Sequence, residues 1–150
     1  MLINCVKWSA PLCLLFILNV GFAQKEIFVK NNQAIQGYDP VAYFKNLKPV
    51  KGRNEFSYNW KGENWYFATQ KNLNDFKANP EKYAPQFGGY CAYGVADGHK
   101  APTSPDAWTI FDGKLYLNYD RNMRDLWVKD MKGFIQQANK NWPAVKKEKD

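Results

Sequence analysis

One hairpin signal limits the possible folds of this sequence more than any other feature. Asp112-Gly113 separates the alternating apolar run at 108–111 from a second run at 115–119. An Asp-Gly pair favours the two-residue turn whose backbone twist matches the strands on either side. We therefore expect an antiparallel β-hairpin in the second half of the chain.

A second hairpin is predicted in the first half. Phe56, Tyr58 and Trp60 alternate with polar residues, which is the period of a strand with one buried face. Residues 61–64 have the composition of a hairpin loop, and 65–68 would form the return strand. A further short strand is predicted at 25–29, at the start of the folded region.

Helix-capping residues predict the helices between and after these hairpins. Asp39, Thr69 and Asp120 are side chains that commonly accept a hydrogen bond at a helix N-terminus. The corresponding helices are expected at 41–45, at 70–78, and in a C-terminal segment whose apolar stripe is Met123, Leu126, Trp127, Phe134, Ile135, Ala138 and Trp142. Gly133 is expected to break that segment. Shorter features are a helical turn at 80–83, a tight turn leading into a helix at 88–96, and an exposed loop at 97–105.

The composition supports a single packed domain. Hydrophobic residues make up 45% of the 150 residues and aromatic residues 17%, so a core can form and disorder is excluded. Trp60, Trp65, Trp108 and Trp127 fall at positions whose period faces a core, and we interpret them as structural. The predicted fold class is α+β, with small antiparallel β-hairpins packed with short helices and a C-terminal helical segment.

The first 23 residues have the layout of a signal peptide. Lys7 is the only charge before position 24, residues 10–20 are apolar except for Asn19, and Gly21 and Ala23 are the small residues that precede a cleavage site. The apolar run is about half of the roughly 20 residues that a membrane-spanning helix needs. We expect a signal peptide at 1–23, a single domain at 24–150, a secreted or periplasmic location, and no transmembrane helix in the mature chain.

Cleavage leaves one cysteine and one histidine, Cys91 and His99, because Cys5 and Cys13 lie in the signal peptide. An internal disulfide is then impossible. Cys91 has two interpretations. A free cysteine is often a small buried apolar residue. Alternatively, a helix that begins after Cys91 would lower the pKa of its thiol, as in a metal or haem ligand, a redox thiol or a nucleophile.

His99 is the second candidate metal ligand, although an exposed loop histidine explains it equally simply. Cys91 and His99 supply two ligands, whereas a structural zinc site has four. Carboxylates such as Asp97, or a second chain, would have to complete the site. The identity of any cofactor stays open at this point, and a transition metal is the candidate that these two residues indicate.

Other function classes find little support. The carboxylates form no pattern typical of general acid–base catalysis, and no glycine-rich loop has the residues that hold a phosphate. The net charge of +7 comes from lysines spread along the sequence, so nucleic acid is not expected as a partner. A basic exported protein would instead be attracted to anionic surfaces, and salt would weaken that attraction.

An ordered set of motifs resembles the YHS domain family, in its branch of small secreted or periplasmic proteins. The matching residues are Gly37-Tyr38-Asp39-Pro40-Val41-Ala42-Tyr43-Phe44, Trp60-x-Gly62-x-x-Trp65-Tyr66-Phe67, Phe76-x-x-x-Pro80-x-x-Tyr83, Gly88-Gly89-Tyr90-Cys91-Ala92-Tyr93-Gly94, Trp108-Thr109-Ile110 and 113–118. Together they span most of the mature chain.

The resemblance implies metal chemistry that this sequence lacks at the corresponding positions. YHS segments of metal transporters are similar in scaffold but carry three cysteines, which suit soft metals. On this chain those positions are Ala42, Ala68 and Asn72. Alanine supplies no ligand atom, and asparagine supplies only a hard oxygen.

Three functions remain open at this point. The leading one is a secreted or periplasmic, non-enzymatic YHS-type binding module that holds a metal or small ligand through its lone cysteine, Cys91. The second is a thiol-dependent redox or transfer enzyme that uses Cys91. The third is a structural or interaction protein without a chemical site.

Overall fold

The computed structural model describes residues 25–149, so the predicted signal peptide lies outside the described residues. The strands are β1 (Val29–Lys30), β2 (Gln33–Ala34), β3 (Arg53–Trp60), β4 (Glu63–Phe67), β5 (Trp108–Phe111) and β6 (Lys114–Leu117). The helices are α1 (Pro40–Lys45), α2 (Gln70–Ala78), α3 (Pro80–Tyr83), α4 (Ala92–Ala96), α5 (Arg121–Trp127) and α6 (Met131–Val145). Single turns of 3-10 helix are η1 (Ile35–Gly37), η2 (Gln86–Gly89) and η3 (Val128–Asp130).

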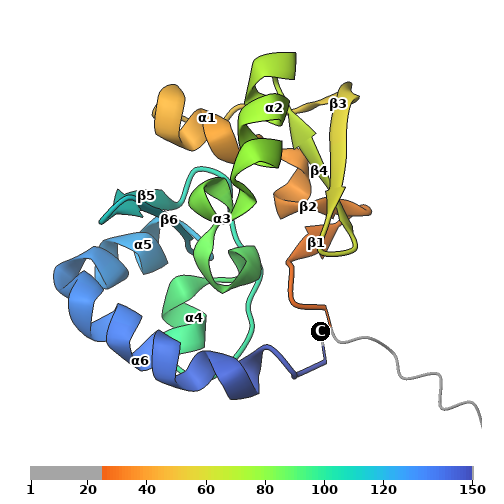
Figure 1. The fold of residues 1–150 in the computed structure, drawn as a ribbon. Coiled ribbons are helices and arrows are strands. Elements are labelled where there is room, and N and C mark those ends of the chain that lie inside the picture. The colour runs from red at the N-terminus through yellow and green to blue at the C-terminus, as the bar shows by residue number, and fades with distance from the viewer. Residues whose placement is uncertain (1–24, 150) are drawn as a thin grey trace, which may run out of the picture.

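The strands pair consecutively as three antiparallel hairpins, and helices pack around them (Figure 1). This confirms the α+β prediction. In the hairpin β5–β6, Trp108 pairs with Leu117 and Phe111 pairs with Lys114. Asp112 and Gly113 both have positive φ, at 51° and 70°, as the predicted two-residue turn requires.

The predicted helix caps are present. Asp39 Oδ1 accepts from the backbone N–H groups of Val41 and Ala42 at the start of α1. Thr69 caps α2, whose bounds agree with the prediction, and Asp120 caps α5. Local side-chain bonds therefore fix the helix starts that the sequence indicated.

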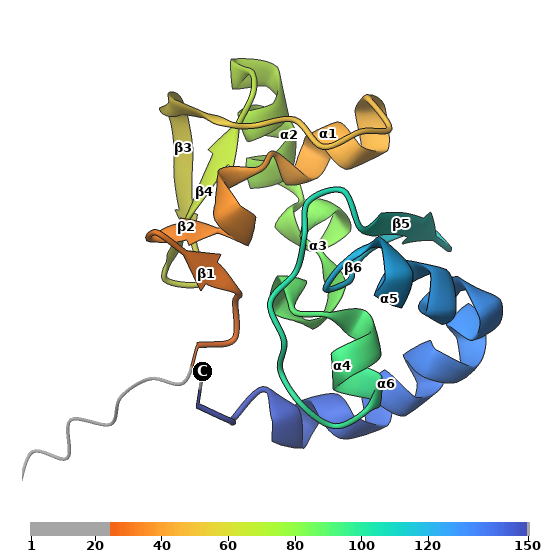
Figure 2. The ribbon, with the colours of Figure 1, turned by 180° about the vertical axis from the view of Figure 1, so that it is seen from behind.

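Two hydrophobic clusters fill the interior, and β6 contributes to both. Leu115 and Leu117 belong to the cluster among α1, α2 and the hairpin β3–β4, whereas Tyr116 belongs to the cluster among α4, α5 and α6. All three side chains are at most 3% exposed. Because successive side chains of a strand point to opposite faces, β6 joins the two groups of elements that Figures 1 and 2 show at opposite ends of the molecule.

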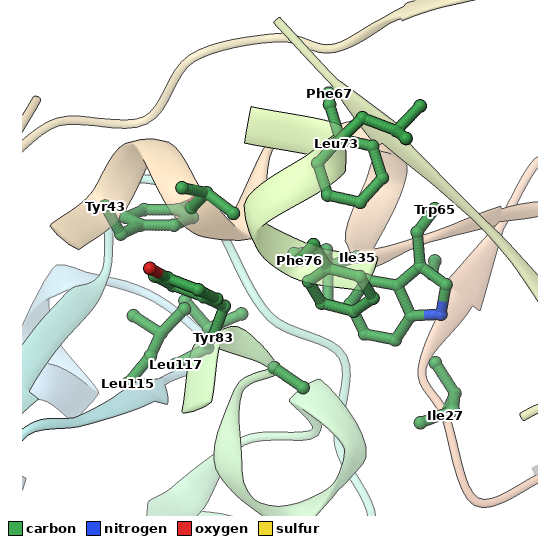
Figure 3. Packing of buried hydrophobic residues seen from close by; sticks show 13 residues of the cluster. Ile27, Ile35, Tyr43, Trp65, Phe67, Leu73, Phe76, Tyr83, Leu115 and Leu117 are labelled. Carbon is green, nitrogen blue, oxygen red and sulfur yellow. The ribbon is translucent and has the colours of Figure 1, made fainter. Parts of the chain in front are cut away.

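The first cluster is built on aromatic contacts. Trp65 and Phe76 lie side by side with ring centroids 5.4 Å apart, and Ile27 lies close to them (Figure 3). Trp65 and Trp127 are fully buried, as expected for structural tryptophans. Trp60 and Trp108 are only half-buried.

The predicted strand at 25–29 is wrong in its bounds. The first strand pair is β1 with β2, joined by Asn31 and Asn32, both with positive φ. Ile27 and Phe28 precede this pair, and the Phe28 N–H donates to Gly88 O at 2.8 Å. This segment is therefore held by η2. A contact between such distant residues leaves no pattern in the local sequence.

The C-terminal segment also differs from the prediction. The helix is interrupted at η3 and not at Gly133, which lies in the first turn of α6 and donates its N–H to the capping residue Asp130. Leu126, predicted to face the core, is 39% exposed. The predicted loop at 97–105 does lack helix and strand, but Thr103 within it is buried and bonded to Gly89 O.

The two ends of the described chain meet. Lys146 forms an ion pair with Glu26 at 3.1 Å, and Lys100 donates to the backbone oxygens of Lys25 and Glu148. Within residues 25–149, no helix is both long enough and apolar enough to cross a bilayer.

Candidate functional site

A cavity of about 200 Å³ opens where segments from both ends of the chain meet the hairpin β3–β4. Its walls come from the residues before β1, the β3–β4 turn, α3, η2 and α6. The lining residues are Glu26, Ile27, Trp60, Lys61, Glu81, Ala84, Pro85, Gln86, Phe87, Gly88, Asn139 and Trp142. The site thus combines aromatic rings, amides and charged groups.

Gly88 allows one wall of the cavity to form. Its φ is +63°, and a Cβ built at this position would lie 1.7 Å from Glu26 O. Any side chain at position 88 would therefore push the segment before β1 away from η2. The close approach also permits the hydrogen bond from the Phe28 N–H to Gly88 O.

Two tryptophans supply aromatic surface to the cavity. Trp60, at the end of β3, packs edge-on against Phe76, and its backbone oxygen accepts from Trp65 Nε1 at 3.1 Å. Trp142, on α6, packs against Phe87 with centroids 5.9 Å apart. Both indoles are half-buried, so they are held by the core yet present surface to the cavity.

The rim carries an ammonium group over an indole ring. Lys61 Nζ lies 4.5 Å from the centroid of the Trp60 ring and 3.1 Å from a carboxylate oxygen of Glu81. Lys61 is the first turn residue of the hairpin, with φ of 51°. The turn therefore directs the ammonium group back over the strand that precedes it.

Cys91 lies outside this cavity, between Tyr90 and Ala92, which belong to the second hydrophobic cluster. It is 2% exposed and caps α4, with its sulfur accepting from the N–H groups of Gly94 and Tyr119 at 3.4 and 3.2 Å. Its thiol lies 3.6 Å from Asn118 Oδ1, to which it donates. Burial raises the pKa of the Cys91 thiol, and this outweighs the N–H groups that favour the thiolate.

His99 is not held with Cys91 in a cluster of ligands. Its imidazole is 53% exposed and lies 3.5 Å from Asp97 through Nδ1. Within residues 25–149, no group of three or more His, Cys, Asp or Glu side chains has the spacing to hold a metal ion. Both predicted ligands therefore have protein partners of their own, and their role in metal binding stays a prediction.

Asn118, which the sequence marks only as the last residue of the motif at 113–118, is fully buried beside Cys91. Its Oδ1 accepts from the Tyr93 N–H at 3.1 Å as well as from the thiol. Its Nδ2 is buried without a hydrogen-bond partner among the described residues. An asparagine after a strand does not by itself indicate a buried side chain. Here the partners of that side chain, Cys91 and Tyr93, lie at the start of α4, far away in the sequence.

The three positions that the family resemblance assigns to cysteines gather around one buried carboxylate. Asp39 is 0% exposed, and its Oδ1 accepts from the Ala42 N–H. Its Oδ2 accepts from the Ala68 N–H at 2.8 Å and from Asn72 Nδ2 at 2.7 Å. In this chain the cluster is thus a network of hydrogen bonds, with the side-chain amide of Asn72 as one of the donors.

Residues 41–87 match the family model of the YHS domain. This chain carries a YHS domain. No curated protein and no solved structure matches the chain. The YHS match runs from the first turn of α1 to the middle of η2 and includes Trp60, Lys61 and Glu81 of the cavity, whereas Asn139 and Trp142 lie beyond it. The cavity is therefore formed jointly by the YHS segment and by the chain on either side of it.

Proposed function

We propose that this chain is an exported, non-enzymatic YHS module that binds a small ligand in the cavity between the hairpin β3–β4 and α6. The observation that carries the proposal is the pair of half-buried indoles, Trp60 and Trp142, lining one cavity with charged and amide groups around them. Small-molecule sites commonly have this composition, an apolar or aromatic surface with a few placed polar groups.

The state of Cys91 supports a binding role over a thiol-dependent enzyme. A catalytic thiol works as a thiolate and needs access to its substrate. Cys91 is buried, its pKa is raised, and it does not line the cavity. The charged side chains that do line the cavity are engaged in ion pairs, Glu26 with Lys146 and Lys61 with Glu81.

A metal is the second candidate ligand, because this chain resembles the YHS segments that are attached to metal transporters. The three positions at which the family carries cysteines cannot supply thiolates here, because they hold Ala42, Ala68 and Asn72. Cys91 would then be the soft ligand available. Metal analysis of the natively purified protein addresses this candidate in the same preparation as the ligand measurement below.

Export is the part of the proposal that rests on residues 1–23. The short apolar run followed by Gly21 and Ala23 supports cleavage before Gln24. N-terminal sequencing of the protein from the exported fraction is expected to begin at Gln24. A chain that begins at Met1 in the membrane fraction would contradict cleavage and export.

Native mass spectrometry of protein purified from its own compartment tests ligand binding. We expect a small-molecule adduct on the wild-type chain. Asn139→Trp, which places a large side chain at an exposed lining position of α6, should lose it. Lys140→Trp is the matched control, since Lys140 is exposed on the same helix and does not line the cavity, and it should keep the adduct.

The two tryptophan variants should unfold at similar temperatures, so that a lost adduct reports the cavity and not the fold. A wild-type chain without any adduct, or an adduct retained by Asn139→Trp, would contradict the proposed site.

A further inference from the structure

The cavity already contains the contacts by which proteins recognise an ammonium ion. The Lys61 ammonium group lies over the Trp60 indole and against the Glu81 carboxylate, at 4.5 Å and 3.1 Å. Attraction of a cation to the face of an aromatic ring, best of all tryptophan, is the basis of recognition of quaternary ammonium ligands. We propose that the cavity binds a small organic cation, an amine or quaternary ammonium compound, which takes the place of the Lys61 ammonium group.

The charge of the lining favours a cation. Glu26 and Glu81 line the cavity, and among residues 25–149 Lys61 is the one cationic side chain in its lining. With the Lys61 ammonium displaced into solvent, the Glu81 carboxylate is left to face the ligand, whereas Glu26 keeps its ion pair with Lys146. The freed Glu81 charge is opposite in sign to that of the chain as a whole, which carries a net charge of +7.

The aromatic surface and the volume limit the ligand further. Trp142 offers a second indole from α6 to the lining of the same cavity. The volume of about 200 Å³ is below the roughly 300–1,000 Å³ of sites for drug-sized molecules. The ligand is therefore a small molecule whose cationic group makes up much of its bulk.

Lys61 is placed to compete with such a ligand. It stands at the tip of the β3–β4 turn, and its side chain is 44% exposed, so it can leave the ring without disturbing the core. Replacing Lys61 by methionine keeps an unbranched side chain that is one atom shorter and removes the competing charge. The affinity for an organic cation should then rise. If Lys61 itself bound the ligand, the affinity should instead fall.

Choline and its neutral isostere, in which carbon replaces the quaternary nitrogen, are the probes. This inference rests on the proposed function. Calorimetric titration of the wild-type protein should show choline binding more tightly than the isostere. Lys61→Met should strengthen choline binding by about twofold to thirtyfold, the range that release of a cation–π contact allows. Trp60→Leu and Glu81→Gln should weaken it.

Lys77→Met is the matched control, because Lys77 lies over Tyr58 at 5.3 Å and lines no part of this cavity. It should leave choline binding unchanged. Because both lysines lie at the surface, neither variant is expected to disturb folding, and the two methionine variants should unfold at the same temperature.

Equal affinity for choline and the isostere would overturn the inference, as would an unchanged or weaker affinity of Lys61→Met. So would the lack of choline binding by both the wild type and Lys61→Met. None of these results would contradict the proposed function if native mass spectrometry still shows an adduct that Asn139→Trp removes. In that case the cavity binds a ligand that is not a cation.

Discussion

The side-chain amide of Asn72 donates to Asp39 Oδ2 at 2.7 Å, across 33 residues of chain. This bond joins the start of α1 to the first turn of α2, and the neighbouring bond from the Ala68 N–H adds the end of the hairpin β3–β4. Asp39 is thus more than the helix cap that the sequence indicated. A fully buried carboxylate with this many N–H donors fixes three elements of the YHS segment relative to each other.

Asp39→Asn is expected to destabilise the protein strongly. The amide can still accept from the Val41 and Ala42 N–H groups through its oxygen, but its NH₂ group then faces the donors Ala68 N and Asn72 Nδ2. Each buried donor left without an acceptor costs about 1–3 kcal/mol. Denaturant unfolding should therefore show a loss of about 2 kcal/mol or more.

Thr69→Ala is the control for this variant, since Thr69 accepts a single capping bond from the Asn72 N–H. It should cost about 1 kcal/mol, the usual value of an N-cap. If Asp39→Asn costs no more than Thr69→Ala, the network around Asp39 does not hold the three elements together.

Gly88→Ala should destabilise the fold much more than Gly113→Ala. Both glycines have positive φ, at 63° and 70°, so both variants introduce the strain of a side chain in the left-handed region, about 1–2 kcal/mol. A Cβ at Gly113 meets no atom within 4 Å, whereas a Cβ at Gly88 meets Glu26 O at 1.7 Å. Equal unfolding free energies for the two variants would show that the segment before β1 does not pack on η2.

Cys91 should react with thiol reagents only after unfolding. Its side chain is 2% exposed, and burial keeps the thiol protonated by raising its pKa. Native labelling at neutral pH should therefore be slow, and labelling in denaturant should be complete. Rapid native labelling would contradict the buried thiol and favour the thiol-dependent enzyme.

The same thiol should make stability depend on alkaline pH. The pKa of Cys91 is raised by folding, so the folded state keeps a proton that the unfolded state releases above pH ~8.5. The unfolded state then binds fewer protons, and the free energy of unfolding falls as pH rises from ~8.5 toward the pKa of the folded state. Below ~8.5 this contribution is fully present.

Comparison with Cys91→Ala isolates this effect. Burial also raises the pKa of Tyr43 and of Tyr116, but these tyrosines are present in both proteins and affect both alike. The difference in unfolding free energy between the wild type and Cys91→Ala should shrink above pH ~8.5. A difference that stays constant to high pH would mean that folding does not raise the pKa of the thiol.

The features that were predictable from sequence are those fixed by neighbouring residues. Thr69 bonds to an N–H three positions on, and Asp112-Gly113 needs only its own backbone conformation, so the cap of α2 and the turn of β5–β6 were both confirmed. The YHS motifs likewise follow the order of the chain. Such features depend on contacts over a few residues, which a linear pattern records.

The candidate site could not be predicted in the same way, because its contacts join distant segments. The strand period of Trp60 predicts a structural core residue, and the helical period of Trp142 predicts a place on the apolar stripe. Both side chains are instead half-buried at one cavity. No local pattern predicts that the Asn72 side chain donates to Asp39, because the two residues are 33 positions apart. Lys61 was assigned only to a hairpin loop, and the turn conformation decides that its ammonium group lies over Trp60.

The indole N–H signals of the protein give the most direct test of the central claim, the proposal that this YHS module binds a small ligand in the cavity at Trp60 and Trp142. A two-dimensional proton–nitrogen spectrum resolves the indole N–H of each tryptophan as a separate signal. These signals are followed while a small-molecule extract, prepared from the compartment in which the protein resides, is added. The account predicts that the signals of Trp60 and Trp142 shift progressively, whereas those of Trp108 and Trp127, which do not line the cavity, stay in place. Signals of Trp60 and Trp142 that remain unmoved at saturating extract, or shifts confined to Trp108 and Trp127, would contradict it.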